Sequence, residues 1–297
     1  MEAAIARITE WRGRPLSYQR IDGGITNLNW KVFLEDERRN YFMKLPGAGT
    51  EVFIDRATAF EAAVKAAAAG VGPQVLHHIE DEGIEVHEFL EGYRSCNVGD
   101  LLDKSIRSNV ALALKAVHET QTLSRKLTGF DQLDLRLGLA LQHGARLPPD
   151  LETLLWQCDR ARRAIEAAGM PLAACFNDAY VTNYMVDAQH NVKIIDWEYA
   201  SNNDPHWDLA VFACETFLGE EGLREMIETH DGRHTDAAEA RINLYIGVAG
   251  VVWSLWAALQ ARISTIPFDF AKYSELLFLR TRHAIAHPRW EEALVAL

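Results

Sequence analysis

The hydrophobic pattern of this chain changes near residue 92. Before that point, four short apolar segments are paired across charged turns, which predicts two antiparallel hairpins. The segments are NWKVFL (29–34), NYFMKL (40–45), PQVLHHI (73–79) and IEVHEFL (84–90). Between the hairpins, the alanine-rich stretch 53–70 ends at Gly70, as a helix with a glycine cap does. The first 92 residues therefore predict a small antiparallel sheet with one helix.

Helical patterns dominate the rest of the chain. The periodicity of residues 97–120 and 150–168 predicts helices, and the segment from Trp207 to the C-terminus is helical in pattern throughout. We therefore predict a bilobal α+β fold, with a small lobe over 1–92, a connector near 87–95 and a large, mostly helical lobe over 93–297. Binding sites in such folds lie in the cleft between the lobes.

Composition narrows the class of partner. The net charge is -12 and the pI about 5.4, whereas nucleic-acid binders usually carry a basic patch. We therefore expect no nucleic-acid partner. The electric field of an acidic protein attracts cations, so a cationic small molecule or a metal ion is the better candidate. The longest apolar run, 244–259, is shorter than the ~18 residues of a membrane span and predicts a buried helix. Four dispersed cysteines and an N-terminus without a signal sequence predict a reduced, cytoplasmic protein; the oligomeric state is left open.

Polar residues gather at the ends of two segments in the second lobe. Asp178 and Asn183 are spaced D-x-x-x-x-N in CFNDAYVTNYMV, and the following strand–turn–strand pattern ends at Asp196. A hairpin returns its ends to one place, so Asp196 is expected beside Asn183. Two carboxylates and an amide oxygen suit Mg²⁺, and a carboxylate not needed as a ligand can act as a base. The alternative is a set of cap and turn residues, but metal and base together are what phosphoryl transfer requires.

The two segments together resemble a known family. FNDAYVTN followed by IIDWEYA is similar to the catalytic and metal-binding segments of the choline/ethanolamine kinases, which belong to the protein-kinase-like small-molecule phosphotransferases together with the aminoglycoside phosphotransferases. The resemblance implies a protein-kinase-like fold, with Asp178 as the catalytic base and Asn183 and Asp196 as Mg²⁺ ligands. It also implies that Glu198 lies close to the metal and the substrate.

The resemblance extends to the nucleotide site in the small lobe, where it implies ATP binding. GGITNLNWKV resembles the loop that covers the nucleotide, Lys44 takes the position of the phosphate-pairing residue, and HEFLEG (87–92) corresponds to the adenine-binding connector. Many choline kinases carry Arg at the position of Lys44, and a glutamate on the helix of the small lobe is expected to pair with it. The implied nucleotide-binding residues are Gly24, Thr26, Asn27, Lys44, Glu61, Glu88 and Leu90.

The C-terminal helices point to the acceptor. VVWSLWAALQARISTIPF resembles the family pattern W-x-x-W-x-x-x-Q that lines the choline pocket. Trp253 and Trp256 are neighbours on one helix face, and aromatic faces suit a quaternary ammonium. Trp207 is a third candidate, although aromatics at helical spacing are also common in cores. Asp208, next to Trp207, resembles an acidic residue that braces the catalytic loop.

We therefore predict an ATP- and Mg²⁺-dependent kinase for the hydroxyl of choline or a related cationic amino alcohol. Ethanolamine, thiamine and aminoglycosides are alternative acceptors. One residue departs from the family pattern: Phe176 stands where the family has a histidine before Asn-Asp. This departure leaves a second reading open, a pseudokinase that binds ligands without transferring phosphate.

Overall fold

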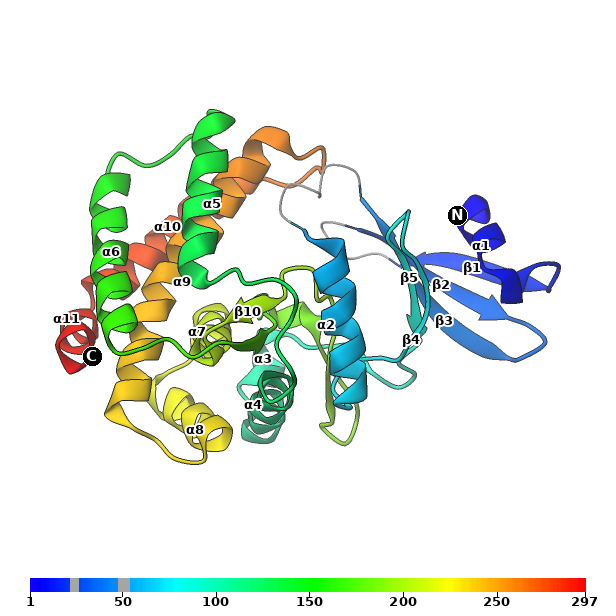
Figure 1. Ribbon diagram of the computed structural model, residues 1–297, viewed down its shortest axis with the longest axis horizontal. Coiled ribbons are helices and arrows are strands. Elements are labelled where there is room, and N and C mark those ends of the chain that lie inside the picture. Colours follow the sequence, from blue (N-terminus) through cyan, green and yellow to red (C-terminus); the bar gives the residue numbers. More distant parts are fainter. Residues whose placement is uncertain (22–26, 48–53) are drawn as a thin grey trace.

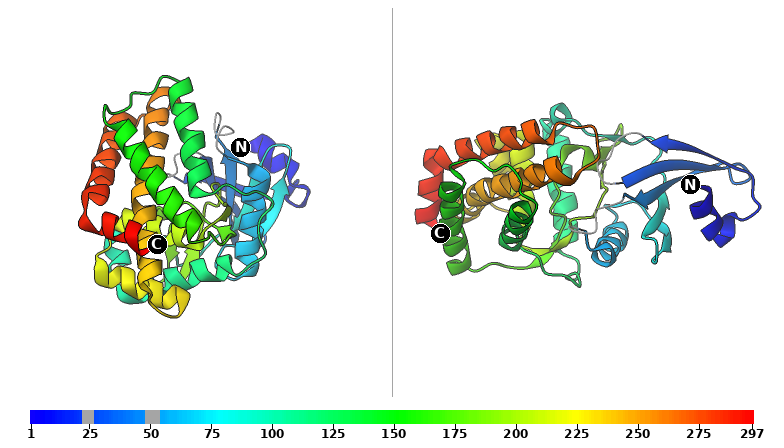
Figure 2. Two further views of the ribbon diagram at one scale, coloured as in Figure 1. Left: turned by 60° about the vertical axis from the view of Figure 1, so that its left-hand side comes forward. Right: turned by 90° about the horizontal axis from the view of Figure 1, so that it is seen from above.

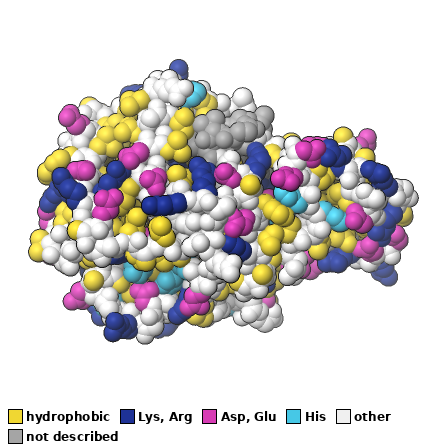
Figure 3. Space-filling view, in the orientation of Figure 1, with side chains coloured by type: hydrophobic (Ala, Val, Ile, Leu, Met, Phe, Trp, Pro, Cys, Tyr) yellow, Lys and Arg dark blue, Asp and Glu magenta, His cyan; other side chains and the backbone are white. Residues whose placement is uncertain are grey.

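The fold is described by a computed structural model, which covers residues 1–21, 27–47 and 54–297. A five-stranded antiparallel sheet lies at one end and a cluster of helices at the other, with the N-terminus beside the sheet and the C-terminus among the far helices (Figures 1 and 2). On the face drawn in Figure 3, acidic and basic side chains are interspersed over both parts. The predicted α+β bilobal fold is confirmed, whereas the boundary at residue 92 stays a prediction.

The sheet has the strand order β1-β2-β3-β5-β4. Its strands are β1 (Leu16–Ile21), β2 (Asn27–Leu34), β3 (Arg39–Pro46), β4 (Val75–Ile79) and β5 (Ile84–Glu88). Both predicted hairpins are present, and β3 pairs with β5 between them. Trp11 of the short helix η1 (Thr9–Trp11) packs with Val32, Met43 and Val86 in a small core on one face; α1 (Glu2–Arg7) lies against the same core.

Helix α2 (Arg56–Ala68) joins the two hairpins. Its N-cap is Asp55, whose side chain accepts a hydrogen bond from Thr58 N. After the helix, Gly70 has a φ of +76°, which agrees with the predicted glycine cap. Its alanine face packs into the core of the helical part. Lys193 Nζ also donates to Gly70 O at 2.6 Å, so the end of this helix is held by the other lobe.

The large lobe is built around α9 (Asp236–Ile263), which packs against α5, α6, α7, α10 and α11. Its neighbours are α5 (Gly129–Gln142), α6 (Leu151–Ala167), α7 (Pro205–Thr216), α10 (Phe270–Ala286) and α11 (Pro288–Ala296); α3 (Val98–Leu101), α4 (Lys104–His118) and α8 (Glu220–Asp231) complete the lobe. Within the described ranges, α9 is the helix long and apolar enough to cross a membrane, but 83% of that apolar window is buried in the protein. The prediction of a buried helix over 244–259 is confirmed.

Helix α5 received no assignment from the sequence. Its segment QLDLRLGLAL alternates apolar and polar residues, a pattern more typical of a strand. A capping box between Thr128 and Asp131 starts the helix instead, and packing on α9 holds it. At its first residue, Gly129, a side-chain Cβ would lie 2.2 Å from the ring of Trp207, so only glycine allows this approach.

Short strands carry the polar segments of the large lobe. β7 (Ala173–Cys175) pairs with β10 (Ser201–Asn203), and β8 (Tyr184–Val186) forms a hairpin with β9 (Val192–Ile194) in register Tyr184 to Ile194, flanked by β6 (Arg94–Ser95). The predicted hairpin is confirmed. All four cysteines are buried free thiols.

Candidate active site

The catalytic segment connects β7 to the hairpin. After Cys175 the chain turns through Asn177, which has a φ of +65°, and one short helix, η2 (Val181–Asn183), leads into β8. Asn183 Nδ2 donates to Asp178 Oδ2 at 3.1 Å and to Asp178 O at 3.2 Å. The two polar residues of the D-x-x-x-x-N motif are therefore in contact, and Asp178 holds the amide nitrogen of Asn183.

Asp196 comes back to the same place through the hairpin, as predicted. Ile195 N donates to Asn183 O at 2.9 Å. Asp196 itself has a φ of +67°, a left-handed conformation that is unfavourable for a residue other than glycine. Strained backbone of this kind concentrates at functional sites, where the surrounding structure enforces it. Asn177 and Asp196 are two such residues within one small region.

Lys44 connects the sheet to this cluster. Its Nζ lies 2.7 Å from Asp196 Oδ1 and 3.2 Å from Glu198 Oε1, and Asn27 Nδ2 donates to the same Glu198 oxygen at 2.8 Å. On the paired strands β2 and β3, Lys44 is opposite Asn29 and Asn27 is opposite Pro46, so Lys44 and Asn27 lie near the same end of the hairpin. The structure thus brings together Lys44, Asn27, Asp196 and Glu198, all of which the sequence placed in the site.

The cluster has an excess of negative charge. Burial raises the pKa of the Asp178 carboxyl well above its usual range, the charge of Asp196 raises it further, and Arg136 opposes these effects. Burial alone would lower the pKa of Lys44, but the carboxylates of Asp196, Glu198 and Glu85 raise it overall and keep the ammonium protonated. The raised pKa makes the carboxylate of Asp178 a stronger proton acceptor than an exposed aspartate, and Lys44 stays a fixed positive charge.

Asp208 braces the backbone of the catalytic segment through hydrogen bonds. This fully buried carboxylate accepts hydrogen bonds from Phe176 N at 2.8 Å and Asn177 N at 2.6 Å, and its Oδ2 lies 2.9 Å from His118 Nε2. The bracing role predicted for Asp208 is confirmed. Phe176 packs edge-on against Trp197 with ring centroids 4.9 Å apart, so its ring fills core space while Asp208 and His118 supply the polar support.

Asn177 ties the catalytic segment to the strand after Asp196. Its Nδ2 donates to Tyr199 O at 2.9 Å and to Ser201 Oγ at 2.7 Å, and its Oδ1 accepts from Asn203 Nδ2 at 2.8 Å. The sequence reasoning assigned no role to Asn177, His118 or Asn203. A signal for Asn177 existed, because an asparagine is among the few residues that tolerate a left-handed turn.

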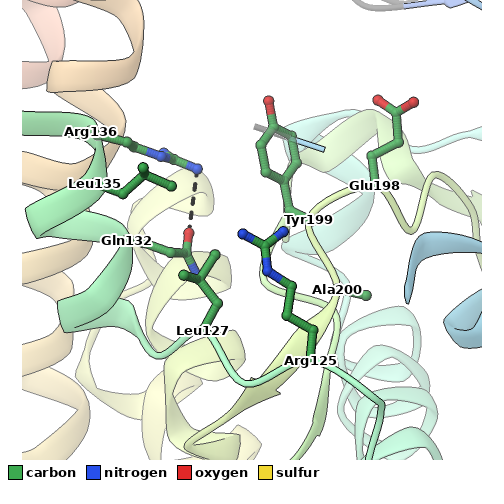
Figure 4. A pocket seen from close by; sticks show the side chains of 8 residues that line it. All are labelled: Arg125, Leu127, Gln132, Leu135, Arg136, Glu198, Tyr199 and Ala200. Atoms are coloured by element: carbon green, nitrogen blue, oxygen red, sulfur yellow. Dashed lines mark hydrogen bonds between the residues drawn. The ribbon is translucent and has the colours of Figure 1, made fainter. Parts of the chain in front are cut away.

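The aromatic residues of α9 meet the residues after Asp196. The rings of Trp253 and Trp256 are 5.9 Å apart, Tyr199 stands edge-on to Trp253 at 5.4 Å, and Trp256 Nε1 donates to Tyr199 Oη at 3.0 Å. The guanidinium of Arg136, from α5, lies over the ring of Trp253 at 4.2 Å. Figure 4 shows Arg136 directed toward Tyr199. The sequence found the two tryptophans but missed Tyr199 and Arg136.

Other predicted site residues lie elsewhere. Trp207 is fully buried against Tyr245 in the core, so it has no surface to offer a ligand. The expected ion pair of Glu61 with Lys44 is not the one present, because Glu61 pairs with Lys65 one helical turn away at 2.8 Å and accepts from Ser124 N. Lys44 finds its partners on the large lobe instead.

Glu88 and Leu90 of the predicted connector are half-buried where β5 ends. The Glu88 carboxylate accepts from Gln74 N at 3.0 Å, and Leu90 O accepts from Tyr93 N in a turn. Gly24 and Thr26 of the expected nucleotide loop lie outside the described residues.

The fold and the catalytic residues together indicate the class of protein. A small antiparallel sheet carrying a lysine, set against a helical lobe with Asp178, Asn183 and Asp196 at one point, is the arrangement of protein-kinase-like phosphotransferases. The choline/ethanolamine kinase family model matches residues 18–222 of the chain. The chain belongs to this family, and it is an ATP-dependent phosphotransferase that acts on the alcohol of an amino alcohol.

Similar proteins cover nearly the whole chain. A probable choline kinase 2 from Arabidopsis thaliana is 22% identical, over 93% of this chain and 89% of that protein. The crystal structure of a choline/ethanolamine kinase family protein from Mesorhizobium loti is 26% identical, with a TM-score of 0.86 over 99% of this chain and 96% of that one. A crystal structure of LicA in complex with AMP is 20% identical, with a TM-score of 0.78 over 96% and 97% of the two chains.

Proposed function

We propose that the chain transfers the γ-phosphoryl group of Mg²⁺-bound ATP to the hydroxyl of choline or a closely related cationic amino alcohol. The observation that carries this proposal is the convergence of Asp178, Asn183, Asp196 and Lys44 from three separate segments: strand β3, the catalytic segment and the end of the β8–β9 hairpin. The similar LicA structure contains AMP, which supports an adenine nucleotide as the phosphoryl donor.

The donor set fits a magnesium ion. Asp196 and Glu198 contact the ammonium of Lys44, and the charges of both raise the pKa of the nearby Asp178 carboxyl, so a bound cation would offset the remaining negative charge. Carboxylate and amide oxygens are the ligands Mg²⁺ prefers, and Asn183 and Asp196 would hold the ion. When bound, Mg²⁺ would neutralise phosphate charge.

The chain's own residues then act on two sides of the transfer. Lys44 places a fixed positive charge at the side of the sheet, where it would meet the phosphates. Asp178 would orient the acceptor hydroxyl and take up its proton, which its raised pKa favours. Asp208 and Asn177 hold Asp178 in place through the hydrogen bonds of the catalytic segment.

The cationic head of the acceptor is assigned to the aromatic and acidic residues beside Asp178. Tyr199, Trp253 and Trp256 form one contiguous aromatic group, and Glu198 adds a buried carboxylate. Choline is the candidate favoured by the paired tryptophans, because a trimethylammonium group donates no hydrogen bonds and is held by aromatic faces. Ethanolamine, thiamine and aminoglycosides are the rivals.

The test is ADP release from Mg-ATP with choline, ethanolamine, thiamine and an aminoglycoside offered in parallel. Asp196→Asn should lower kcat by about 10³-fold or more, since it removes a ligand and a phosphate-site charge together. Asp159→Asn, on the exposed face of α6, is the matched control and should keep wild-type turnover. Normal turnover by Asp196→Asn would refute the mechanism.

A pseudokinase is the second reading, because Phe176 replaces the family's histidine. It predicts thermal stabilisation by nucleotide without ADP release from any acceptor. The bracing by Asp208 and His118 weighs against it, because the catalytic segment keeps polar support without that histidine.

A further inference from the structure

A cavity beside the catalytic segment is surrounded by hydrogen-bond donors. Arg125, Gln132 and Arg136 line it together with the ring of Tyr199. Figure 4 shows the guanidinium groups of Arg125 and Arg136 directed toward the space beside Tyr199, with Gln132 hydrogen-bonded to Arg136. Glu198 also borders the cavity, but its carboxylate is engaged by Lys44 and Asn27. The groups that face the cavity therefore bring positive charge.

Arg136 is a buried cation without an anionic partner. Its side chain belongs to a residue that is only 2% exposed, and its two nitrogens donate to Val252 O and Gln132 Oε1 at 3.3 Å each, which are long contacts. Among the described residues no carboxylate forms an ion pair with it. Burial lowers the pKa of Arg136 to about 10. A buried charge in this condition is costly unless something else compensates it.

Two neighbours share this lack of a partner. Gln132, also 2% exposed, has a buried Nε2 with no acceptor within the described part of the chain. The half-buried Arg125 forms no side-chain ion pair in the same ranges. Two guanidinium groups and a free amide N–H around one cavity form a receptor for an anion, because carboxylates and phosphates accept two N–H bonds from arginine at once.

The cavity lies beside the reacting groups. The charges of Arg136 and Asp178 act on each other's pKa, and Tyr199 and Glu198 follow Asp196 directly in the chain. Arg136 also covers one face of Trp253 with a cation of the protein itself, so that face cannot take a trimethylammonium group. In this structure the cavity holds about 10 Å³, the room of one water, so binding of a larger group requires the half-buried Arg125 to shift.

We propose that the acceptor alcohol carries an anionic group, a carboxylate, in addition to its ammonium, and that Arg125, Arg136 and Gln132 bind it. This inference rests on the proposed function, because it concerns the acceptor of that reaction. It keeps the phosphoryl transfer and selects, among the amino alcohols, a zwitterionic acceptor over choline, with the ammonium toward Glu198 and the carboxylate between the two arginines.

The transferred phosphoryl group is the other anion that could reach these arginines. The two sources differ in their kinetic signature. Arginines that bind the phosphoryl group would support transfer to every acceptor equally, whereas arginines that bind a carboxylate would support only the acceptors that have one. Matched acceptor pairs separate the two cases: ethanolamine with L-serine, and choline with N,N,N-trimethylserine, each pair differing by one carboxylate.

The experiment measures kcat/KM for each pair with wild-type protein, Arg125→Met, Arg136→Met and, as a control, Arg163→Met on the exposed surface of α6. Wild-type protein should prefer the carboxylated member of each pair by roughly ten-fold or more, the worth of one charge-assisted contact. Arg125→Met and Arg136→Met should lower that preference by a similar factor, Arg125→Lys should restore part of it, and Arg163→Met should leave the ratio unchanged.

A binding measurement keeps the inference testable apart from turnover. L-serine and ethanolamine are added to nucleotide-free protein, and the melting temperature is followed for wild type and Arg125→Met, a half-exposed position where folding is least at risk. Stabilisation by L-serine in the wild type alone supports the anion site even if no acceptor is phosphorylated. Three results would overturn the inference: a preference for the member of each pair that lacks the carboxylate, an equal loss of kcat/KM on all acceptors in the arginine variants, or no stabilisation by L-serine.

Discussion

The bond network of Asp208 gives the sharpest prediction about how the catalytic segment is held. Asp208→Asn keeps the shape of the side chain but replaces one acceptor oxygen with an N–H₂ group. Three donors face this carboxylate, Phe176 N, Asn177 N and His118 Nε2, at 2.6 to 2.9 Å. An amide offers one acceptor atom in place of two, so at least one buried donor loses its partner.

The expected magnitude follows from burial. Removing one side of a buried charged network costs about 3 kcal/mol, and Asp208 is fully buried. For a protein of this size that corresponds to a fall in melting temperature of about 6 °C. Because Asn177 precedes Asp178, the loosened segment should also lower kcat by about ten-fold or more.

Thermal unfolding and steady-state ADP release measure the two effects on the same preparation. Asp134→Asn is the matched control, since its pair with Arg162 is on the surface and should be worth less than about 1 kcal/mol. If Asp208→Asn melts within about 1 °C of wild type and keeps its kcat, the bracing role is refuted.

Three further predictions concern other parts of the molecule. Gly129→Ala should destabilise the protein by about 1–3 kcal/mol in urea unfolding, because its Cβ would lie 2.2 Å from Trp207; Gly138→Ala, with nothing within 4 Å and inside the same helix, should instead stabilise by about 0.5–1 kcal/mol. Burial lowers the pKa of His230 below 6.5, so the unfolded chain binds its proton more readily and the unfolding free energy should fall as pH drops through 6.5. His230→Asn should flatten that slope by up to about 1.4 kcal/mol per pH unit, and an unchanged slope would contradict the assignment. Lys44→Met should lower kcat/KM for ATP by about 10²-fold or more, with Lys44→Arg retaining more activity than Lys44→Met; equal loss in both would show that the charge itself is not what matters.

Local sequence patterns were sufficient where the decisive contacts are close in the chain. The turn between β8 and β9 brings Ile195 N to Asn183 O, so spacing alone could place Asp196 beside Asn183. The glycine after α2 and the charged turns between strands are equally local signals, and they predicted the sheet lobe and its helix. The resemblance to the choline/ethanolamine kinases added the roles of these residues, which spacing could not distinguish from caps and turns.

Contacts between distant segments escaped the sequence. Lys44 and Asp196 are 152 positions apart, and the pairing of Lys44 with the large lobe, in place of Glu61, follows from how the lobes meet. Helix α5 has an alternating pattern, and only its cap and its packing on α9 made it a helix. That packing also carries Arg136 onto Trp253. The sequence by itself determined the short-range geometry of the catalytic segments, because a short hairpin can bring its two ends together in only a few ways. The surroundings of the acceptor depend instead on side chains from α5, α9 and the residues after Asp196. Only the tertiary structure decides how these distant side chains pack together.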